Sequence, residues 1–271
     1  MTATTALTAQ NTQGVLDIHY VPSAFVSKQI DACVDDIGVD VIKIGMLASA
    51  ETVDAVAQAL EKHGRPTCVL DPVMVATTGA QLLPNAAVTN IRTRLLPLTT
   101  VLTPNLSEAR LLLENAGIKS IPEINSAGDL VHIATLLKSM GPKYILIKGG
   151  HLPFNNHYQV PQQAETRKYV VDVLHTDDKT TLFITDFSHS KNTHGTGCSL
   201  ASAIASNLAL GDEVPDAVEK ACRYVEAGIK TSANLGHGSG PINHFHSLET
   251  AREPPCGSSL RVRDWNIDEE L

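Results

Sequence analysis

Apolar and polar positions alternate along this chain in two different rhythms, one helical and one typical of buried strands. Over residues 23–37 the apolar side chains recur at helical spacing, and residues 39–44 then form a short run rich in valine and isoleucine. Strands that are apolar almost throughout are typical of parallel sheets, because helices cover both faces of such sheets. The sequence therefore predicts an α/β fold with a mainly parallel sheet.

The same alternation continues over most of the chain. Further helices are expected at residues 49–64, 86–96, 107–115, 126–140, 196–210 and 216–235, and further strands at 67–70, 100–102, 144–147, 170–174 and 182–186. Residues 153–166 are polar and long enough for an insertion or a lid. We expect one domain over residues 1–250 and a flexible C-terminal tail over 251–271, which carries prolines, a glycine and mixed charges.

Composition narrows the class of partner. The 21 Lys and Arg residues against 29 Asp and Glu give a formal net charge of -8, which disfavours nucleic acid and an anionic membrane surface. The five cysteines form no CxxC pair, so neither a disulfide framework nor a zinc site is indicated. No apolar run is long enough for a membrane span, and the first residues lack the features of a signal peptide. These observations favour a reducing compartment, the cytoplasm.

Polar and glycine residues follow four successive predicted strands. The strand ends read KIGM (43–46), LDPVM (70–74), LTPNLSE (102–108) and IKGGH (147–151). Each motif alone is consistent with ordinary turn chemistry. Ligands of doubly wound sheets bind beyond the carboxyl ends of the strands, so the recurrence of such residues at that one location favours a ligand site.

The segment His194 to Cys198, HGTGC, directly precedes a helix rich in alanine and serine. Glycines allow backbone N–H groups to turn together toward an anion, and the helix dipole adds positive charge at the same end. This pattern predicts a phosphate-binding turn, and the alternative is a glycine-rich helix cap with a structural thiol. Cys198 lies in the first helical turn, where the pKa of a thiol is commonly lowered, and this favours the first interpretation.

Asp71, Asn105 and Glu108 are oxygen ligands at adjacent strand ends, and such residues can hold Mg²⁺ directly or through water. The alternative is that Glu108 is a solvated helix carboxylate and Asn105 the cap of that helix. Lys148 stands where an ammonium group can reach a nucleotide phosphate, although many lysines merely end strands.

Histidines raise two further hypotheses. His244 and His246 flank Phe245 without nearby carboxylates or thiols in the sequence, and we assign no metal to them. His194 lies four residues before Cys198, which raises a cysteine-nucleophile hydrolase as a rival. A hydrolase would not account for the DPVM and TPN turns.

The strings TALTAQNT, KIGML, DPVMVATTG, LTPNLSEA, IKGGH, NTHGTGCSLASAIA and GPINHF, in this order from Thr5 to about Leu248, resemble the hydroxymethylpyrimidine and phosphomethylpyrimidine kinases of thiamine biosynthesis. The resemblance implies a ribokinase-like, three-layer αβα sandwich and a cytoplasmic enzyme, commonly a homodimer. It implies ATP- and Mg²⁺-dependent phosphorylation of 4-amino-5-hydroxymethyl-2-methylpyrimidine and then of its monophosphate.

The resemblance also implies roles for individual residues. Gln10 matches the glutamine that hydrogen-bonds the aminopyrimidine, and Met46 and Val73 match walls of the substrate pocket. Cys198 matches the proposed catalytic base. The remaining matches are an anion hole at Gly195, Thr196 and Gly197, a nucleotide-contacting lysine at Lys148, and a region that organises magnesium and phosphates at Asp71, Asn105 and Glu108.

Two departures from the family pattern have consequences. The family opens with a strand and a turn of the type GSDSSGGAGIQAD, which this sequence lacks, so we expect an N-terminally incomplete domain of lower stability and activity. Residues 76–79, ATTG, stand where relatives often have a lysine or serine. Two alternatives therefore stay open: a pyridoxal kinase-like enzyme and a non-catalytic nucleotide- or pyrimidine-binding paralogue or fragment.

Overall fold

A computed structural model describes residues 1–74, 83–150, 152–249 and 257–265, so the 76–79 departure lies outside the described residues. Within these residues the chain forms a seven-stranded sheet in the order β3-β4-β5-β6-β7-β8-β9. Pairing is parallel from β3 to β6 and antiparallel from β6 to β9. The strands are β3 Val41–Ile44, β4 Thr67–Leu70, β5 Val101–Leu102, β6 Tyr144–Ile147, β7 Tyr169–His175, β8 Thr180–Asp186 and β9 Arg261–Trp265.

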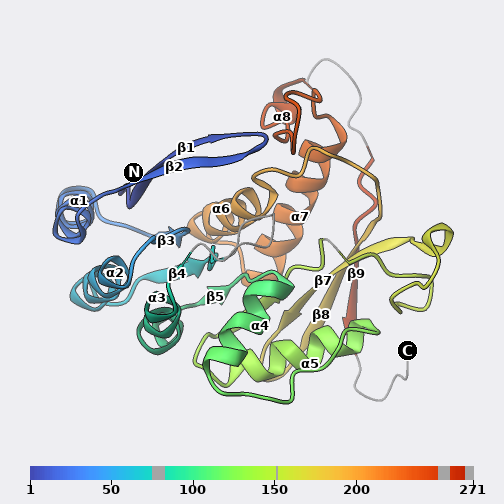
Figure 1. Cartoon of the computed structure of the whole chain (residues 1–271), viewed down its shortest axis with the longest axis horizontal. Coiled ribbons are helices and arrows are strands. Elements are labelled where there is room, and N and C mark those ends of the chain that lie inside the picture. The colour runs from blue at the N-terminus through green and yellow to red at the C-terminus, as the bar shows by residue number, and fades with distance from the viewer. Residues whose placement is uncertain (75–82, 151, 250–256, 266–271) are drawn as a thin grey trace.

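Helices cover both faces of this sheet (Figure 1). They are α1 Ser23–Asp36, α2 Ala50–Lys62, α3 Asn85–Asn90, α4 Leu106–Asn115, α5 Ala127–Lys138, α6 Thr196–Ala209, α7 Val214–Lys230 and the short α8 His246–Glu249. A π-helical turn Ile91–Leu95 and a 3-10 turn Leu96–Leu98 extend α3, and another 3-10 turn is Ala164–Thr166. The predicted three-layer α/β architecture is confirmed.

The two faces of the sheet belong to two separate cores. In β4 the buried side chains of Cys68 and Leu70 join a core with α2 to α5, whereas Val69 joins a core with α6 and α7. This alternation follows from the period of two along a strand, and strands that are apolar at every position satisfy both faces. Parallel register then brings the ends of β3 to β6 to one edge, since Ile44 pairs with Leu70 and Leu70 with Leu102.

A separate antiparallel hairpin, β1 Ala6–Asn11 and β2 Gly14–Tyr20, stands apart from the main sheet. Figure 1 shows this hairpin extending from α1 toward the segment that precedes α8. At its tip the carbonyl oxygen of Thr12 accepts a hydrogen bond from the N–H of Ser239 at 2.8 Å. Most residues of both strands are exposed, so hydrophobic burial contributes little to holding the hairpin in place.

The expectation of a loose tail is wrong for residues 261–265. They form β9, which pairs with β8, and Glu226 on α7 accepts hydrogen bonds from the N–H of Ser259 at 3.0 Å and from the hydroxyl of Ser258 at 2.7 Å. The segment was missed because its charged, exposed side chains are those of an edge strand.

The 153–166 loop is held in place by the side chain of Phe154, which is fully buried. No helix in the described part of the chain combines the length and apolarity that crossing a bilayer requires.

Candidate functional site

Gly195 begins the anion-binding turn. It precedes α6 with φ 81°, a left-handed backbone conformation that favours glycine. The N–H groups of Gly197 and Cys198 have no backbone acceptor among the described residues, and the first turn of α6 contains no acidic side chain. Thr196 closes the turn, because its hydroxyl donates to the carbonyl oxygen of Thr193 at 2.9 Å. This end of α6 is therefore suited to bind an anion.

A second loop, residues 234–241, supports this turn, and the sequence analysis missed it. The N–H of Gly240 donates to the carbonyl oxygen of Lys191 at 3.0 Å, and the N–H of His194 donates to that of Gly240 at 3.1 Å. The buried Asn192 side chain donates to Asn234 Oδ1 at 2.6 Å. The tip of the β1–β2 hairpin contacts this same loop, so the loop links the hairpin to the anion-binding turn.

Lys148 and Asp71 form a buried ion pair beside the turn. Lys148 Nζ lies 2.7 Å from Asp71 Oδ1, and their side chains are 14% and 2% exposed. Burial acts to lower the pKa of Lys148, but the carboxylates of Asp71 and Glu108 outweigh it, and this pKa lies above its ordinary value. Lys148 is therefore charged at neutral pH, and it lies together with Asp71 at the edge of the sheet where the sequence places the ends of both strands.

Glu108 and Asn105 form a capping box at the start of α4. The N–H of Asn105 donates to Glu108 Oε2 at 2.8 Å, and the N–H of Glu108 donates to Asn105 Oδ1 at 2.9 Å. Asn105 is thus a helix cap, as one alternative stated, but Glu108 is buried and not a solvated carboxylate. Burial raises the pKa of Glu108 to about 7, against the opposing charge of Lys148.

Cys198 is accessible in the first turn of α6. The expectation of a lowered thiol pKa is wrong: the pKa of Cys198 is raised, first by desolvation and then by the charge of Asp71. Lys43 and Lys148 act in the opposite direction without outweighing these effects. The charge of Asp71 therefore acts both on the thiol and on the buried ammonium group.

Lys43 is a functional candidate that the sequence analysis passed over. Its Nζ lies 2.8 Å from the position that a Cβ would take at Gly45, and Lys148 Nζ lies 3.0 Å from the Cβ position of Gly197. The absence of a side chain at Gly45 and Gly197 thus leaves room for the ammonium groups of Lys43 and Lys148, respectively. Lys43 has no ion-pair partner within the described residues, and its place in KIGM, at the end of β3, was the available signal.

The predicted substrate residues lie on three different segments of the chain. Gln10 is exposed on β1, and its Oε1 accepts a hydrogen bond from Thr8 Oγ1 at 3.5 Å. Met46 follows β3, and its carbonyl oxygen accepts a hydrogen bond from Thr5 Oγ1 at 2.7 Å. Val73 follows β4, where its N–H donates to the carbonyl oxygen of Asp71 at 2.8 Å. Among the described residues, Gln10 makes no hydrogen bond or ion pair with the charged cluster.

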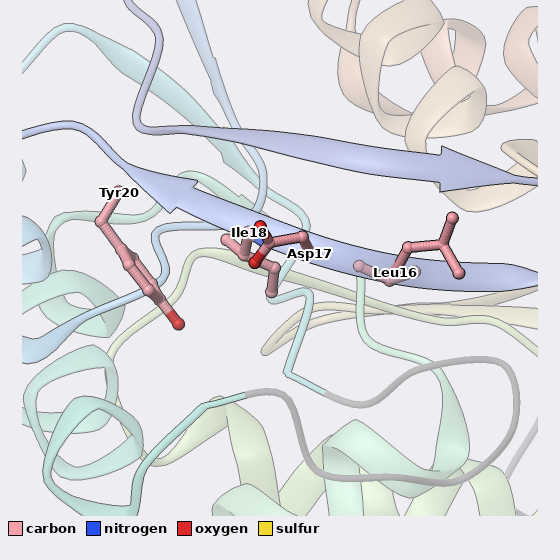
Figure 2. A pocket seen from close by; sticks show the side chains of 5 residues that line it. Leu16, Asp17, Ile18 and Tyr20 are labelled. Atoms are coloured by element: carbon pink, nitrogen blue, oxygen red, sulfur yellow. The ribbon is translucent and has the colours of Figure 1, made fainter.

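An open pocket of about 400 Å³ lies along β2, lined by Val15, Leu16, Asp17, Ile18 and Tyr20. Figure 2 shows Leu16, Ile18 and Tyr20 spaced along this one strand. None of the predicted catalytic residues lines it. The pocket is a feature of the hairpin surface, and not of the cluster around Lys148.

Metal binding by protein groups alone has no support in the described ranges, where no three His, Cys, Asp or Glu side chains are grouped as ligands. Asp71 and Glu108 remain as two carboxylates beside a turn suited to phosphate. Mg²⁺ is commonly held by one or two carboxylates together with substrate phosphates and water. The donor set therefore fits Mg²⁺ that arrives with a nucleotide.

Comparison with known proteins adds independent findings. Residues 1–243 match the family model described as phosphomethylpyrimidine kinase. The chain is 43% identical over 249 residues to the thiamine biosynthesis bifunctional protein ThiED of Geobacter sulfurreducens, a match that covers 92% of this chain and 47% of that protein. The chain spans about half the length of the first curated relatives that it matches.

Two solved structures are similar in fold. The phosphomethylpyrimidine kinase of Clostridium difficile shares 32% identity with a TM-score of 0.66, and the match covers 83% of this chain and 84% of that one. The pyridoxal kinase of Staphylococcus aureus, in complex with AMP-PCP and pyridoxal, shares 26% identity with a TM-score of 0.77, over 97% and 87% of the two chains.

Proposed function

The chain belongs to the phosphomethylpyrimidine kinase family, and from that premise we propose that it transfers the γ-phosphoryl group of ATP to a hydroxymethylpyrimidine and then to its monophosphate. In the first step the hydroxyl oxygen forms a bond to phosphorus, the bond from phosphorus to the ADP oxygen breaks, and the hydroxyl proton leaves. In the second step a phosphate oxygen of the monophosphate, already deprotonated at neutral pH, forms the bond and the same ADP bond breaks, so no proton has to leave. The observation that carries the proposal is the pairing of the anion-binding turn of α6 with the buried Lys148–Asp71 ion pair.

This arrangement supplies what phosphoryl transfer requires. The transition state is loose, so catalysis depends mainly on positioning and on neutralising charge. Free N–H groups at Gly197 and Cys198 and the ammonium group of Lys148 supply donors of this kind. They belong to separate elements, α6 and the end of β6, so a phosphoryl group between them would be held from two sides.

Cys198 accepts the proton in this proposal. Because the pKa of its thiol is raised, the thiol holds its own proton at neutral pH and has to release it before it accepts another. Asp71, the carboxylate whose charge acts on the thiol, is the proposed acceptor of that proton. In the hydrolase alternative a histidine would activate the sulfur, whereas the charged groups that act on the thiol among the described residues are Asp71, Lys43 and Lys148.

Mg²⁺ and the pyrimidine complete the proposal. Asp71 and Glu108 would hold Mg²⁺ together with the nucleotide phosphates, and the ion would neutralise phosphate charge. Asn105 keeps Glu108 in place through the capping box and lies beside Lys148 where nucleotide would bind. Gln10, Met46 and Val73 would recognise the aminopyrimidine.

ADP formation by the purified chain tests the proposal, with hydroxymethylpyrimidine and its monophosphate as separate substrates. Cys198→Ala is expected to lose transfer by about a hundredfold or more while it still binds ATP. Cys33→Ala, which removes a thiol from α1, is the matched control and is expected to keep full turnover. Absence of turnover on both pyrimidines with retained binding would instead support a non-catalytic module, and unchanged turnover in Cys198→Ala would overturn the role of the base.

A pyridoxal kinase is the second candidate, because the Staphylococcus aureus pyridoxal kinase has a similar fold over nearly the whole chain. The two candidates use the same phosphoryl donor and differ in the ring that is recognised. We expect kcat/KM for the pyrimidine to exceed that for pyridoxal, since Gln10 offers both a donor and an acceptor to an aminopyrimidine edge. A higher kcat/KM for pyridoxal would reverse the assignment.

A homodimer is also part of the proposal, and the hairpin supports it. Leu7, Leu16 and Tyr20 on this two-stranded sheet are 58%, 79% and 55% exposed, and a two-stranded hairpin is marginally stable without cover. Light scattering is expected to show a dimer that Leu16→Lys weakens. Leu210→Lys, at a position 83% exposed at the end of α6, is the matched control. A monomeric wild type would contradict the dimer.

Location in the cytoplasm is the last part of the proposal. Cys33, Cys68, Cys198 and Cys222 are free thiols, and Cys198 has to stay reduced to accept a proton. Reducing conditions in the cytoplasm keep such thiols free. Cell fractionation with an antibody against the chain tests this, and recovery in a secreted or membrane fraction would contradict it.

A further inference from the structure

Asp172 occupies an unusual place in β7. Along this strand Val171 and Val173 point into the core with α2 to α5, whereas Leu174 belongs to the core with α6 and α7. The alternation of strand side chains puts Asp172 on the same face as Leu174, where an apolar residue is expected. A carboxylate in such a place is costly unless it is hydrogen-bonded.

The hydrogen-bond partners of Asp172 lead toward the charged cluster. Its Oδ1 accepts a hydrogen bond from the N–H of Gly149 at 2.8 Å, and its Oδ2 accepts one from Cys222 Sγ at 3.9 Å. Burial raises the pKa of Asp172 to about 6, while the Gly149 hydrogen bond and the charge of Lys148 partly oppose this effect. The carboxylate therefore interacts with the residue that directly follows Lys148, and with Lys148 itself.

Gly149 has a packing requirement of its own. The paired register of β6 and β7 ends at Ile147 and Val173, and the main chain of Gly149 then passes so close to β7 that a Cβ would collide with the carbonyl oxygen of Val171. At this point the Asp172 carboxylate, and not a main-chain carbonyl, accepts the N–H. The Asp172 side chain thus adds one hydrogen bond between the segment after β6 and β7, beyond the last main-chain pair of the two strands.

The main chain around Lys148 is consequently held on both sides. On the side of β5 the N–H of Lys148 donates to the carbonyl oxygen of Pro104 at 2.9 Å, and on the side of β7 Asp172 holds Gly149. From this fixed segment the side chain of Lys148 extends to Asp71 at 2.7 Å. A long, flexible side chain is directed accurately only when its main chain is fixed.

We propose that Asp172 is a positioning residue that fixes Gly149 and thereby aims the Lys148 ammonium group at the transferring phosphoryl group. This role rests on the proposed kinase function, because it assigns a purpose to the position of Lys148. Cys222 is part of the device, since its thiol occupies the second oxygen of Asp172 and keeps the carboxylate oriented.

Three variants of the full-length chain test the role. In Asp172→Leu the leucine side chain is similar in shape to aspartate and suits the apolar face, but it cannot accept a hydrogen bond from the N–H of Gly149. In Asp172→Asn the side chain keeps an acceptor oxygen. Asp186→Leu removes an exposed carboxylate from neighbouring β8 and is the matched control. We expect Asp172→Leu to lower kcat by about tenfold or more with little change in KM for the pyrimidine, and Asp172→Asn to restore most of it.

Two readouts do not depend on turnover. Hydrogen exchange of the Gly149 amide is expected to be about tenfold faster in Asp172→Leu and close to wild type in Asp172→Asn. Reductive methylation of Lys148, followed by mass spectrometry, is expected to be faster in Asp172→Leu as well. If the wild type phosphorylates neither pyrimidine, the proposed function fails, and these two readouts still decide whether Asp172 positions Lys148.

Wild-type kcat and wild-type protection of Gly149 in Asp172→Leu would overturn the proposal, and so would an Asp172→Asn protein as impaired as Asp172→Leu. Thermal melting of every variant separates positioning from unfolding. If Asp172→Leu does not fold, Asp172→Ala takes its place with the same expected results.

Discussion

The charged cluster at the carboxyl ends of β3 to β6 and the β1–β2 hairpin differ in how this chain holds them. In the cluster, Asp71 and Glu108 are 2% and 3% exposed, and each has a partner on another element or in a capping box. On the hairpin, Leu16 is 79% exposed and Gln10 is exposed as well. The chain therefore fixes the chemical end of the proposed site by itself, whereas the recognition end has little support within the described residues.

This difference suggests a division of labour between the two regions. Charges in a low-dielectric environment act strongly and need no reorganisation when they are already in place. An exposed hairpin suits a role in which binding of substrate, or of a second copy, supplies the missing contacts. We therefore expect cluster variants to change kcat and stability, and hairpin variants to change KM.

The largest effect is expected for Lys148→Met. It leaves Asp71 buried without its cation, beside a second buried carboxylate, Glu108. Loss of one partner of a buried ion pair costs about 3 kcal/mol or more, and loss of a phosphate-directed cation lowers kcat by about a hundredfold or more. Urea denaturation and ADP formation measure the two effects. Lys143→Met, at an exposed lysine before β6, is the matched control. A Lys148→Met protein with normal kcat would show that the charged cluster does not determine kcat, which contradicts the expected difference between the cluster and the hairpin.

Glu108→Gln is expected to change the pH dependence of stability. In the wild type the pKa of Glu108 is raised from 4.5 to about 7, so the unfolded chain releases this proton at a lower pH than the folded chain. The favourable contribution is thus fully present below pH 4.5 and is lost as the pH rises toward 7, by roughly 3 kcal/mol at most. The glutamine keeps the capping acceptor and does not titrate.

Urea denaturation between pH 5 and about 8, in the absence of divalent ions, measures this contribution. The free energy of unfolding is expected to fall with rising pH in the wild type more steeply than in Glu108→Gln. Glu114→Gln, at an exposed position on the same helix, is expected to behave as the wild type does. Parallel pH profiles for all three proteins would show that Glu108 is not desolvated.

The sequence predicted the alternation of strands and helices well, because apolar periodicity is a local property that tertiary packing then uses. It also indicated Lys148, Asp71 and Glu108, since parallel strands must end at one edge. It failed where through-space effects decide: the pKa of Cys198 depends on Asp71, which lies 127 positions away in the chain. It missed Asp172 because a single carboxylate in an apolar strand gives no motif, and β9 because an exposed edge strand lacks an apolar run.

On the hairpin, Gln10→Ala is expected to raise KM for the pyrimidine by about tenfold, which corresponds to one lost hydrogen-bonding group at about 1.4 kcal/mol. The KM for ATP and kcat are expected to stay close to wild type, because Gln10 makes no hydrogen bond or ion pair with the charged cluster among the described residues. Gln13→Ala, at the exposed turn of the same hairpin, is the control. A lower kcat with unchanged KM would place Gln10 with the cluster instead.

The smallest effect is expected for Lys43→Met. Lys43 lowers the pKa of Cys198 by its charge, so its loss raises that pKa further and leaves less thiolate at a given pH. Iodoacetamide labelling of Cys198 at pH 8, followed by peptide mass spectrometry, is expected to slow by about two- to threefold. Lys28→Met, at an exposed position on α1, is the control for a general loss of positive charge. If Lys28→Met slows labelling equally, Lys43 acts only through net charge. A specific slowing would instead extend the fixed cluster to β3, the strand that leads directly to Met46, a proposed substrate residue.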